Sequence, residues 1–151
     1  MKGKTFALKS AYAYSRPDPF DHSRQSTVIA FSERLIDAKQ IDAAKDRFGA
    51  LSHAMNDYVP DKEERPASVE IIIARDDPQF PIQQIGYELP GLSSSASVGA
   101  GKYKLDLKRN DGKRIEGTLR STKEADKTAE HGGYFDLHFA LDVASARPGQ
   151  K

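Results

Sequence analysis

The last third of the chain alternates apolar and polar residues over three stretches, and this alternation constrains the fold most. Residues 102–108 read KYKLDLK, residues 114–120 read RIEGTLR and residues 135–143 read FDLHFALDV. A period of two is typical of strands with one buried and one exposed face. The predicted buried row consists of Tyr103, Leu105, Leu107, Ile115, Gly117, Leu119, Phe135, Leu137, Phe139, Leu141 and Val143. We therefore predict a three-stranded antiparallel meander over residues 102–143.

The turn between the first two of these strands must keep both apolar rows on one face, because a slip of one residue moves a whole row into water. A three-residue loop, Asn-Asp-Gly at 110–112, meets this condition and places Leu107 opposite Ile115. Such a loop needs a left-handed residue at its end, which Gly112 supplies. We also expect Gly117, which lacks a side chain, to allow a neighbouring group to approach closely.

Alternating or apolar stretches predict further strands at 5–14, 25–32, 69–75 and 82–89. The strand at 69–75 is apolar on both faces and should be central in a sheet. Pro81 predicts an edge position for the strand at 82–89. Residues 92–101 are small and polar, which indicates a long loop or a weak edge strand.

The period changes to 3.6 after the second strand. Asp37 and Gln40 have the spacing of a capping box, which begins a helix. An apolar stripe follows at Ile41, Ala44, Phe48, Leu51, Met55 and Tyr58. We predict one amphipathic helix at 38–58, with Gly49 allowing close contact between helix and sheet.

These elements predict a single domain, 1–151, that is mainly β. The expected architecture is a two-layer antiparallel β-sandwich of immunoglobulin-like size, with about seven strands and the one helix. The alternative is an α+β arrangement, in which the helix lies across one face of a single antiparallel sheet.

Composition excludes several classes of function. The 23 Lys and Arg residues nearly balance 22 Asp and Glu residues, which argues against nucleic acid as a partner. The absence of cysteine excludes disulfides, thiol catalysis and cysteine-based metal sites. No apolar stretch is long enough to predict a transmembrane segment. No signal peptide is evident, so the sequence leaves the compartment open: periplasmic or extracellular if a signal peptide was removed, otherwise cytoplasmic.

The polar face of the predicted meander is the best candidate for binding. Its candidate residues are Lys104, Lys108, Arg114, Arg120, Asp136 and His138. A carboxylate beside an imidazole can tune a base, but the pair has no evident nucleophile. We therefore assign no catalytic residue and no cofactor.

Asp18, Asp21 and His22 are weak candidates for a metal site, because hard ligands lie close together there. Their spacing lacks the pattern of a calcium loop. Turn residues that bond their own backbone are the alternative explanation, so we predict no metal.

From about Gly86 onward, the segments GKYKLDLKRNDGKRIEGTLRS and GGYFDLHFALDV resemble small bacterial domains of unknown function, many of them exported. The likeness covers less than half of the chain and carries no catalytic residues. It implies a bacterial, exported and non-enzymatic protein.

The sequence thus favours a non-catalytic binding or interaction module for an unknown protein or small-molecule ligand. One alternative is a small hydrolase that uses His138 and Asp136. The other is a carrier of small apolar ligands, with a pocket between helix and sheet.

Overall fold

The computed structural model describes residues 7–18, 20–56, 66–77, 81–89, 92–97, 103–121 and 136–145. These residues form eight strands and two short helices, so the prediction of a mainly β chain is confirmed. The elements are β1 (Ser10–Pro17), β2 (Gln25–Ser32), α1 (Ala38–Ala43), α2 (Arg47–Asn56), β3 (Ser68–Ala74), β4 (Ile82–Leu89), β5 (Leu92–Ser97), β6 (Tyr103–Asn110), β7 (Arg114–Ser121) and β8 (Asp136–Ala144).

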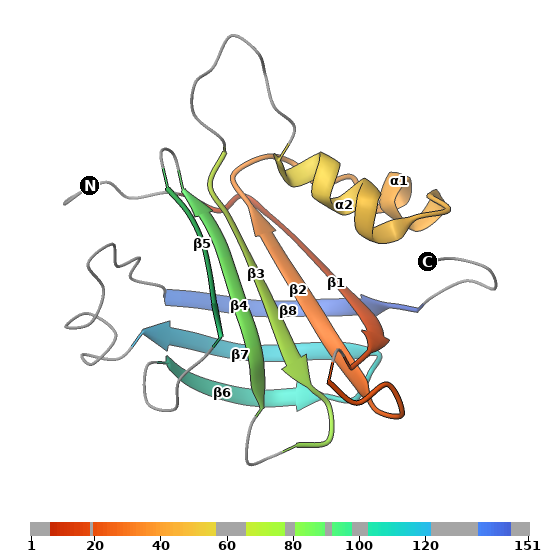
Figure 1. The fold of residues 1–151 in the computed structure, drawn as a ribbon, viewed down its shortest axis with the longest axis vertical. Coiled ribbons are helices and arrows are strands. Elements are labelled where there is room, and N and C mark those ends of the chain that lie inside the picture. Colours follow the sequence, from red (N-terminus) through yellow and green to blue (C-terminus); the bar gives the residue numbers. More distant parts are fainter. Residues whose placement is uncertain are drawn as a thin grey trace, which may run out of the picture.

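All eight strands belong to one sheet, in the order β5-β4-β3-β2-β1-β8-β7-β6. Neighbours are antiparallel except β1 and β8, which run parallel through Ala13↔Val143 and Tyr14↔Ala144. The sheet bends so that β6–β8 cross behind β1–β4, nearly closing a barrel with β5 and β6 as its free edges (Figure 1). The two-layer sandwich of immunoglobulin-like size is therefore not confirmed, because the strands form one mixed sheet.

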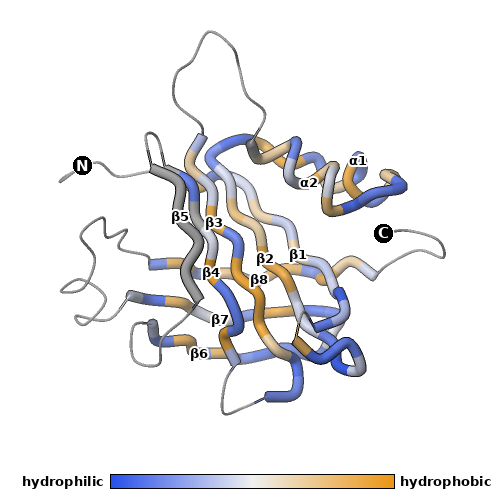
Figure 2. Tube along the Cα trace, viewed as in Figure 1, coloured by the Kyte–Doolittle hydropathy of each residue, from blue (hydrophilic) through white to orange (hydrophobic). Residues whose placement is uncertain are grey.

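The barrel interior is the main core. Apolar residues from both halves of the bent sheet pack there, and Figure 2 shows hydrophobic positions along β2 and β3. The buried members are Ala13, Ile29, Phe31, Val69, Ile71, Ile73, Ile85, Ile115, Leu119, Phe139 and Val143. Fully burying each large aliphatic side chain contributes roughly 1.5–3 kcal/mol. The bend thus buries the apolar row of the meander without a second sheet.

A second core lies on the outer face of β1–β3, beneath the two helices. It contains Tyr12, Tyr14, Val28, Ala30, Ile41, Leu51, Met55 and Ile72. This arrangement explains why the central strand β3 is apolar on both faces, as predicted for residues 69–75.

The meander and its two faces are confirmed, but the predicted hairpin register is wrong. Leu107 lies opposite Gly117, not Ile115, and Leu105 lies opposite Leu119. A bulge beside Lys108 inserts one extra residue between Leu107 and Arg109. Without this extra residue, the four-residue turn would put the Leu107 side chain on the opposite face of the sheet from Ile115. The bulge returns Leu107 to the core side.

The four-residue turn is held by its first residue. The Asp111 carboxylate accepts hydrogen bonds from the amides of Lys113 and Arg114, both at 2.9 Å. These bonds, together with one from Arg109, hold the pKa of Asp111 well below its ordinary value. Gly112 has a φ of 82°, so the prediction of a left-handed glycine is confirmed.

Gly117 lies against the backbone of β6, which confirms a close approach. A Cβ here would lie 2.4 Å from the Asp106 carbonyl oxygen and 3.2 Å from the Leu107 Cα.

Overpacking of this kind costs about 1–3 kcal/mol, so Gly117→Ala should lower the free energy of unfolding by about 2 kcal/mol in urea denaturation. Gly86→Ala is the matched control, because a Cβ there would meet nothing within 4 Å. We expect Gly86→Ala to be neutral or slightly stabilising. An equal loss in both variants would refute the steric explanation.

The single helix predicted at 38–58 is wrong, because two helices meet at a break. Asp37 caps α1, as predicted, by accepting a hydrogen bond from the Lys39 amide. The chain leaves the helix at Ala44, and Asp46 then precedes α2 and accepts a hydrogen bond from the Gly49 amide at 3.0 Å. The space beside Gly49 is taken by the Asp46 carboxylate, not by the sheet as predicted.

The break also turns the predicted apolar stripe. Phe48 is 54% exposed, whereas Arg47 is buried with 3% exposed. Ile41, Leu51 and Met55 are buried as predicted. Tyr58 lies outside the described residues.

The remaining strands show smaller differences from prediction. The strand at 25–32 is confirmed, while the strand predicted at 5–14 is β1 at 10–17. β4 lies between β3 and β5, so the predicted edge position is wrong. Pro81 precedes the strand and therefore removes no ladder hydrogen bond. β5 is the weak edge strand that was one of two expectations for 92–101.

Candidate functional site

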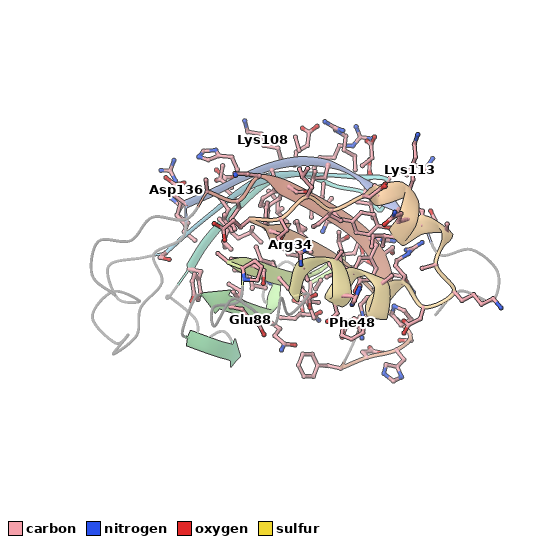
Figure 3. The ribbon with its side chains drawn as sticks, turned by 90° about the horizontal axis from the view of Figure 1, so that it is seen from above. Arg34, Phe48, Glu88, Lys108, Lys113 and Asp136 are labelled. Carbon is pink, nitrogen blue, oxygen red and sulfur yellow. The ribbon has the colours of Figure 1, made fainter. Side chains whose placement is uncertain are left out.

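The outer face of β6–β8 brings all six predicted binding residues together. Each strand contributes alternate residues that point away from the core: Lys104 and Lys108 from β6, Arg114 and Arg120 from β7, and Asp136 and His138 from β8. Figure 3 shows Lys108 and Asp136 on this side of the molecule, with Phe48 and Glu88 on the opposite side. We call this surface the meander face.

The arginines of the meander face are neutralised by neighbouring carboxylates. The Arg114 Nε lies 2.5 Å from the Glu116 Oε1, and an Nη of Arg114 lies 2.9 Å from the Asp142 Oδ1. The hydrogen bond to Glu116, followed by that to Asp142, raises the pKa of Arg114. The Arg120 Nε lies 3.2 Å from the Asp136 Oδ1. These exposed pairs order the surface more than they stabilise the fold.

The two lysines of β6 differ from the arginines. The side chains of Lys104 and Lys108 are exposed, and neither side chain makes a hydrogen bond or ion pair with another residue in the described part of the chain. Lys104 lies opposite Arg120 in the register, but Arg120 is itself paired with Asp136. Asp106 lies between the two lysines on the same face of β6. The outer face of β6 therefore carries an excess of one positive charge, from two lysines against one carboxylate.

His138 and Asp136 are in contact, with 3.3 Å between the His138 Nε2 and the Asp136 Oδ1. The same oxygen also accepts a hydrogen bond from Arg120. The His138 side chain is 64% exposed, and Thr118 lies opposite it in the register. This open surface lacks the enclosure that strengthens electrostatic effects in an active site.

Asp18 is buried and acts as a turn residue. Its Oδ1 accepts hydrogen bonds from the amides of Phe20 and Asp21, at 2.7 and 3.0 Å. Its Oδ2 accepts from Ser26 at 3.1 Å and from Gln83. Burial raises the pKa of Asp18, but these hydrogen bonds outweigh it and lower the pKa. All the acceptor positions of the carboxylate are thus occupied by protein donors.

The other two metal candidates do not join Asp18. Asp21 accepts hydrogen bonds from the amide and hydroxyl of Ser23 and lies 3.3 Å from Arg24, and His22 is exposed. No group of three potential ligands capable of holding a metal occurs among the residues that the structure describes. The turn explanation for Asp18 and Asp21 is confirmed by these bonds.

Comparisons with known proteins give no guide to function. No family model, curated protein or solved structure matches this chain. Within the described ranges, neither helix is long and apolar enough to cross a membrane. Function therefore has to be inferred from the side chains themselves.

Sequence reasoning missed a polar cluster centred on Arg47. The Arg47 guanidinium donates hydrogen bonds to the Ala144 carbonyl at 3.3 Å and to the Ser145 carbonyl at 2.5 Å. It also lies 5.6 Å from the centre of the Tyr14 ring, within range of a cation–π contact. The signal was available in the sequence, since Arg47, Leu51 and Met55 are four residues apart and share one helix face.

Two tyrosines complete this cluster. Burial raises the pKa of Tyr14 to about 12, and the Glu70 charge adds to the effect. Burial and a hydrogen bond to Asp42 raise the pKa of Tyr12 further. Both hydroxyls therefore stay protonated at neutral pH and cannot act as bases.

The same cluster bears on the predicted apolar-ligand carrier. Tyr12 and Tyr14 pack with Leu51 and Met55 between the helices and the sheet. These side chains pack together in the interface in which the pocket was predicted. The cluster is best explained as the attachment of the helices to the barrel.

Proposed function

We propose that the chain is a non-catalytic interaction module that binds an acidic surface of another protein through the meander face. The observation that carries this proposal is the contrast between neutralised arginines and the exposed, unneutralised Lys104 and Lys108. Charged residues at an exposed surface steer association and set specificity more than they contribute affinity. The near-neutral total charge favours a local acidic partner over nucleic acid.

The test compares charge reversal on the meander face with charge reversal elsewhere. The double variant Lys104→Glu/Lys108→Glu should weaken binding of a short poly-glutamate peptide at least tenfold in low-salt calorimetry, about 1.4 kcal/mol or more. The matched control is Lys39→Glu/Lys45→Glu, which changes the same charge at exposed positions in and beside α1. We expect the control to bind like the unmodified chain, with affinity falling as salt rises.

Two outcomes would contradict the proposal. Equal weakening in both double variants would mean that only net charge matters. If a single-stranded oligonucleotide bound as tightly as the poly-glutamate peptide, the meander face would be assigned to nucleic-acid binding, although it has no aromatic side chains on which bases could stack.

The hydrolase alternative is supported only by the contact between His138 and Asp136. Saturable turnover of a simple ester that His138→Ala abolishes would replace the proposed function. Export of the protein rests on the resemblance to bacterial domains, and a signal peptide encoded upstream of Met1 would support it.

A further inference from the structure

The two free edges of the sheet differ in how they are protected. Edge strands expose unpaired backbone groups, and proteins guard them with charged side chains, proline or bulges. β6 has two of these devices, because it carries Lys104, Asp106, Lys108 and Arg109 and a bulge beside Lys108. β5 has none of them. Its sequence, LSSSAS, contains no charge and no proline, and it pairs with β4 in an unbroken register from Leu92 to Ser97.

The outer edge of β5 also has no backbone partner in the described part of the chain. β4 is its only neighbour in the sheet, and no backbone hydrogen bond from a described turn or loop reaches it. An edge that is regular, uncharged and unpaired is a template for another strand.

We infer that β5 pairs antiparallel with β5 of a second copy of this chain, joining the two sheets across a twofold axis. In such a pair Leu92 lies opposite Ser97, and the axis passes between Ser94 and Ser95. No charge then meets its own copy, whereas the same pairing of β6 would place Lys104 opposite Arg109 of the second copy. A twofold interface uses the same patch on both copies, so it must be self-complementary in this way.

The residue types of β5 favour a second copy over a foreign peptide. Specific recognition of a foreign strand relies on pockets for alternate side chains, beyond the backbone hydrogen bonds. Serine and alanine offer small side chains that provide little selection but allow close approach. In Figure 1 β5 lies on the opposite side of the barrel from α1 and α2, so the helices do not obstruct a second copy.

The interface is short, because β5 has six residues. Stable interfaces generally bury more than about 1,000 Å², which a single edge strand does not reach. We therefore expect a weak dimer, with a Kd on the order of tens to hundreds of micromolar. This inference is independent of the meander face, since β5 and β6 are opposite ends of the sheet order.

The test is sedimentation velocity of the full chain over a concentration series. We expect a monomer that converts to a dimer as concentration rises, and Ser95→Glu should weaken dimerisation at least tenfold. Ser95 is register-paired with Gly86, beside which there is open space, and Glu70 on the next strand adds to the negative charge. The matched control is Ala43→Glu, which adds the same charge at an exposed position of α1.

Hydrogen exchange supplies a readout that needs no variant. Amides in 92–97 should become more protected as concentration rises, while those of β6 should not change. A chain that stays monomeric up to about 1 mM would overturn the inference. A dimer with unchanged exchange in β5, or one equally stable in Ser95→Glu, would also overturn it. Loss of the dimer in Lys104→Glu/Lys108→Glu would assign the contact to the meander face instead.

Discussion

Replacing Arg47 with methionine is expected to lower the free energy of unfolding by about 3 kcal/mol. Arg47 is 3% exposed, and its guanidinium donates to the Ala144 and Ser145 carbonyls. Methionine keeps much of the aliphatic length but donates no hydrogen bond. A hydrogen bond from a charged group contributes about 1.5–3 kcal/mol, and methionine makes neither of the two.

The loss should be large because Arg47 supports the weakest junction of the sheet. Among the described residues, β1 and β8 are paired in register only through Ala13↔Val143 and Tyr14↔Ala144, and this is the one parallel contact between the described strands. Arg47 binds the chain at the end of this contact and holds α2 against it. Removing it should therefore loosen both the helices and the closure of the barrel.

The measurement is urea denaturation followed by far-UV circular dichroism, with Lys45→Met as control. Lys45 is exposed and lies two residues away, so its replacement should change the free energy of unfolding by less than about 0.5 kcal/mol. For a chain of this size, 3 kcal/mol corresponds to a decrease in Tm of roughly 6–12 °C. An Arg47→Met variant as stable as Lys45→Met would show that Arg47 is not a support of the junction.

The faces of the meander could be predicted because burial and exposure alternate with each residue. That rule placed Leu119 and Phe139 inward and Lys104 and His138 outward, as the structure has them. The register could not be predicted, because it depends on a bulge beside Lys108 and on hydrogen bonds to the Asp111 carboxylate. Both are local choices of the backbone that hydrophobic periodicity does not encode.

The closure of the sheet into a barrel could not be predicted, for a different reason. Ala13 and Val143 are paired although 129 residues separate them in the sequence, and neither carries a signal for a parallel neighbour. The apolar faces of the strands had to be shielded from water, and a second sheet would shield them as well as a single bent sheet does. The helix break could not be predicted either, because the apolar spacing in the sequence continues across residues 44–46, where the chain leaves the helix.

The residues of the meander face could be predicted from the sequence, but the ion pairs among them could not. Alternation alone put Lys108, Arg114 and Asp136 on one surface. Which cation is neutralised depends on the register, since Arg114 meets Asp142 only because the two lie opposite one another. The contrast between paired arginines and unpaired lysines therefore emerged only from the structure.

Replacing Asp18 with alanine should lower the free energy of unfolding by about 3 kcal/mol at neutral pH. The carboxylate is 2% exposed and accepts from two backbone amides, Ser26 and Gln83. It joins the turn between β1 and β2 to β4, where the register shifts beside Gln83. Alanine removes the acceptor of the two amides and of Gln83, while the Ser26 hydroxyl keeps the Gln83 Oε1 as an acceptor at 2.8 Å. Hydrogen bonds to a charged group contribute about 1.5–3 kcal/mol each before solvent replaces them.

The pH dependence of stability gives an independent test of the role of the Asp18 carboxylate. The folded pKa of Asp18 is lowered from 3.8, so the folded chain holds its proton less tightly than the unfolded chain. The resulting stability is fully present above the unfolded value of about 4 and is lost as pH falls through the folded pKa. The difference between the unmodified chain and Asp18→Ala should therefore be constant from pH 7 to about 5 and shrink below about 4.

Asp76→Ala is the control, because Asp76 is exposed at the end of β3 and has the same side chain. It should change the free energy of unfolding by less than about 0.5 kcal/mol. A difference between the unmodified chain and Asp18→Ala that stays constant from pH 7 to pH 2 would mean that Asp18 acts through packing. A bound cation in place of protein donors would instead make the loss depend on added chelator, and the hydrogen bonds to both Asp18 oxygens argue that it will not.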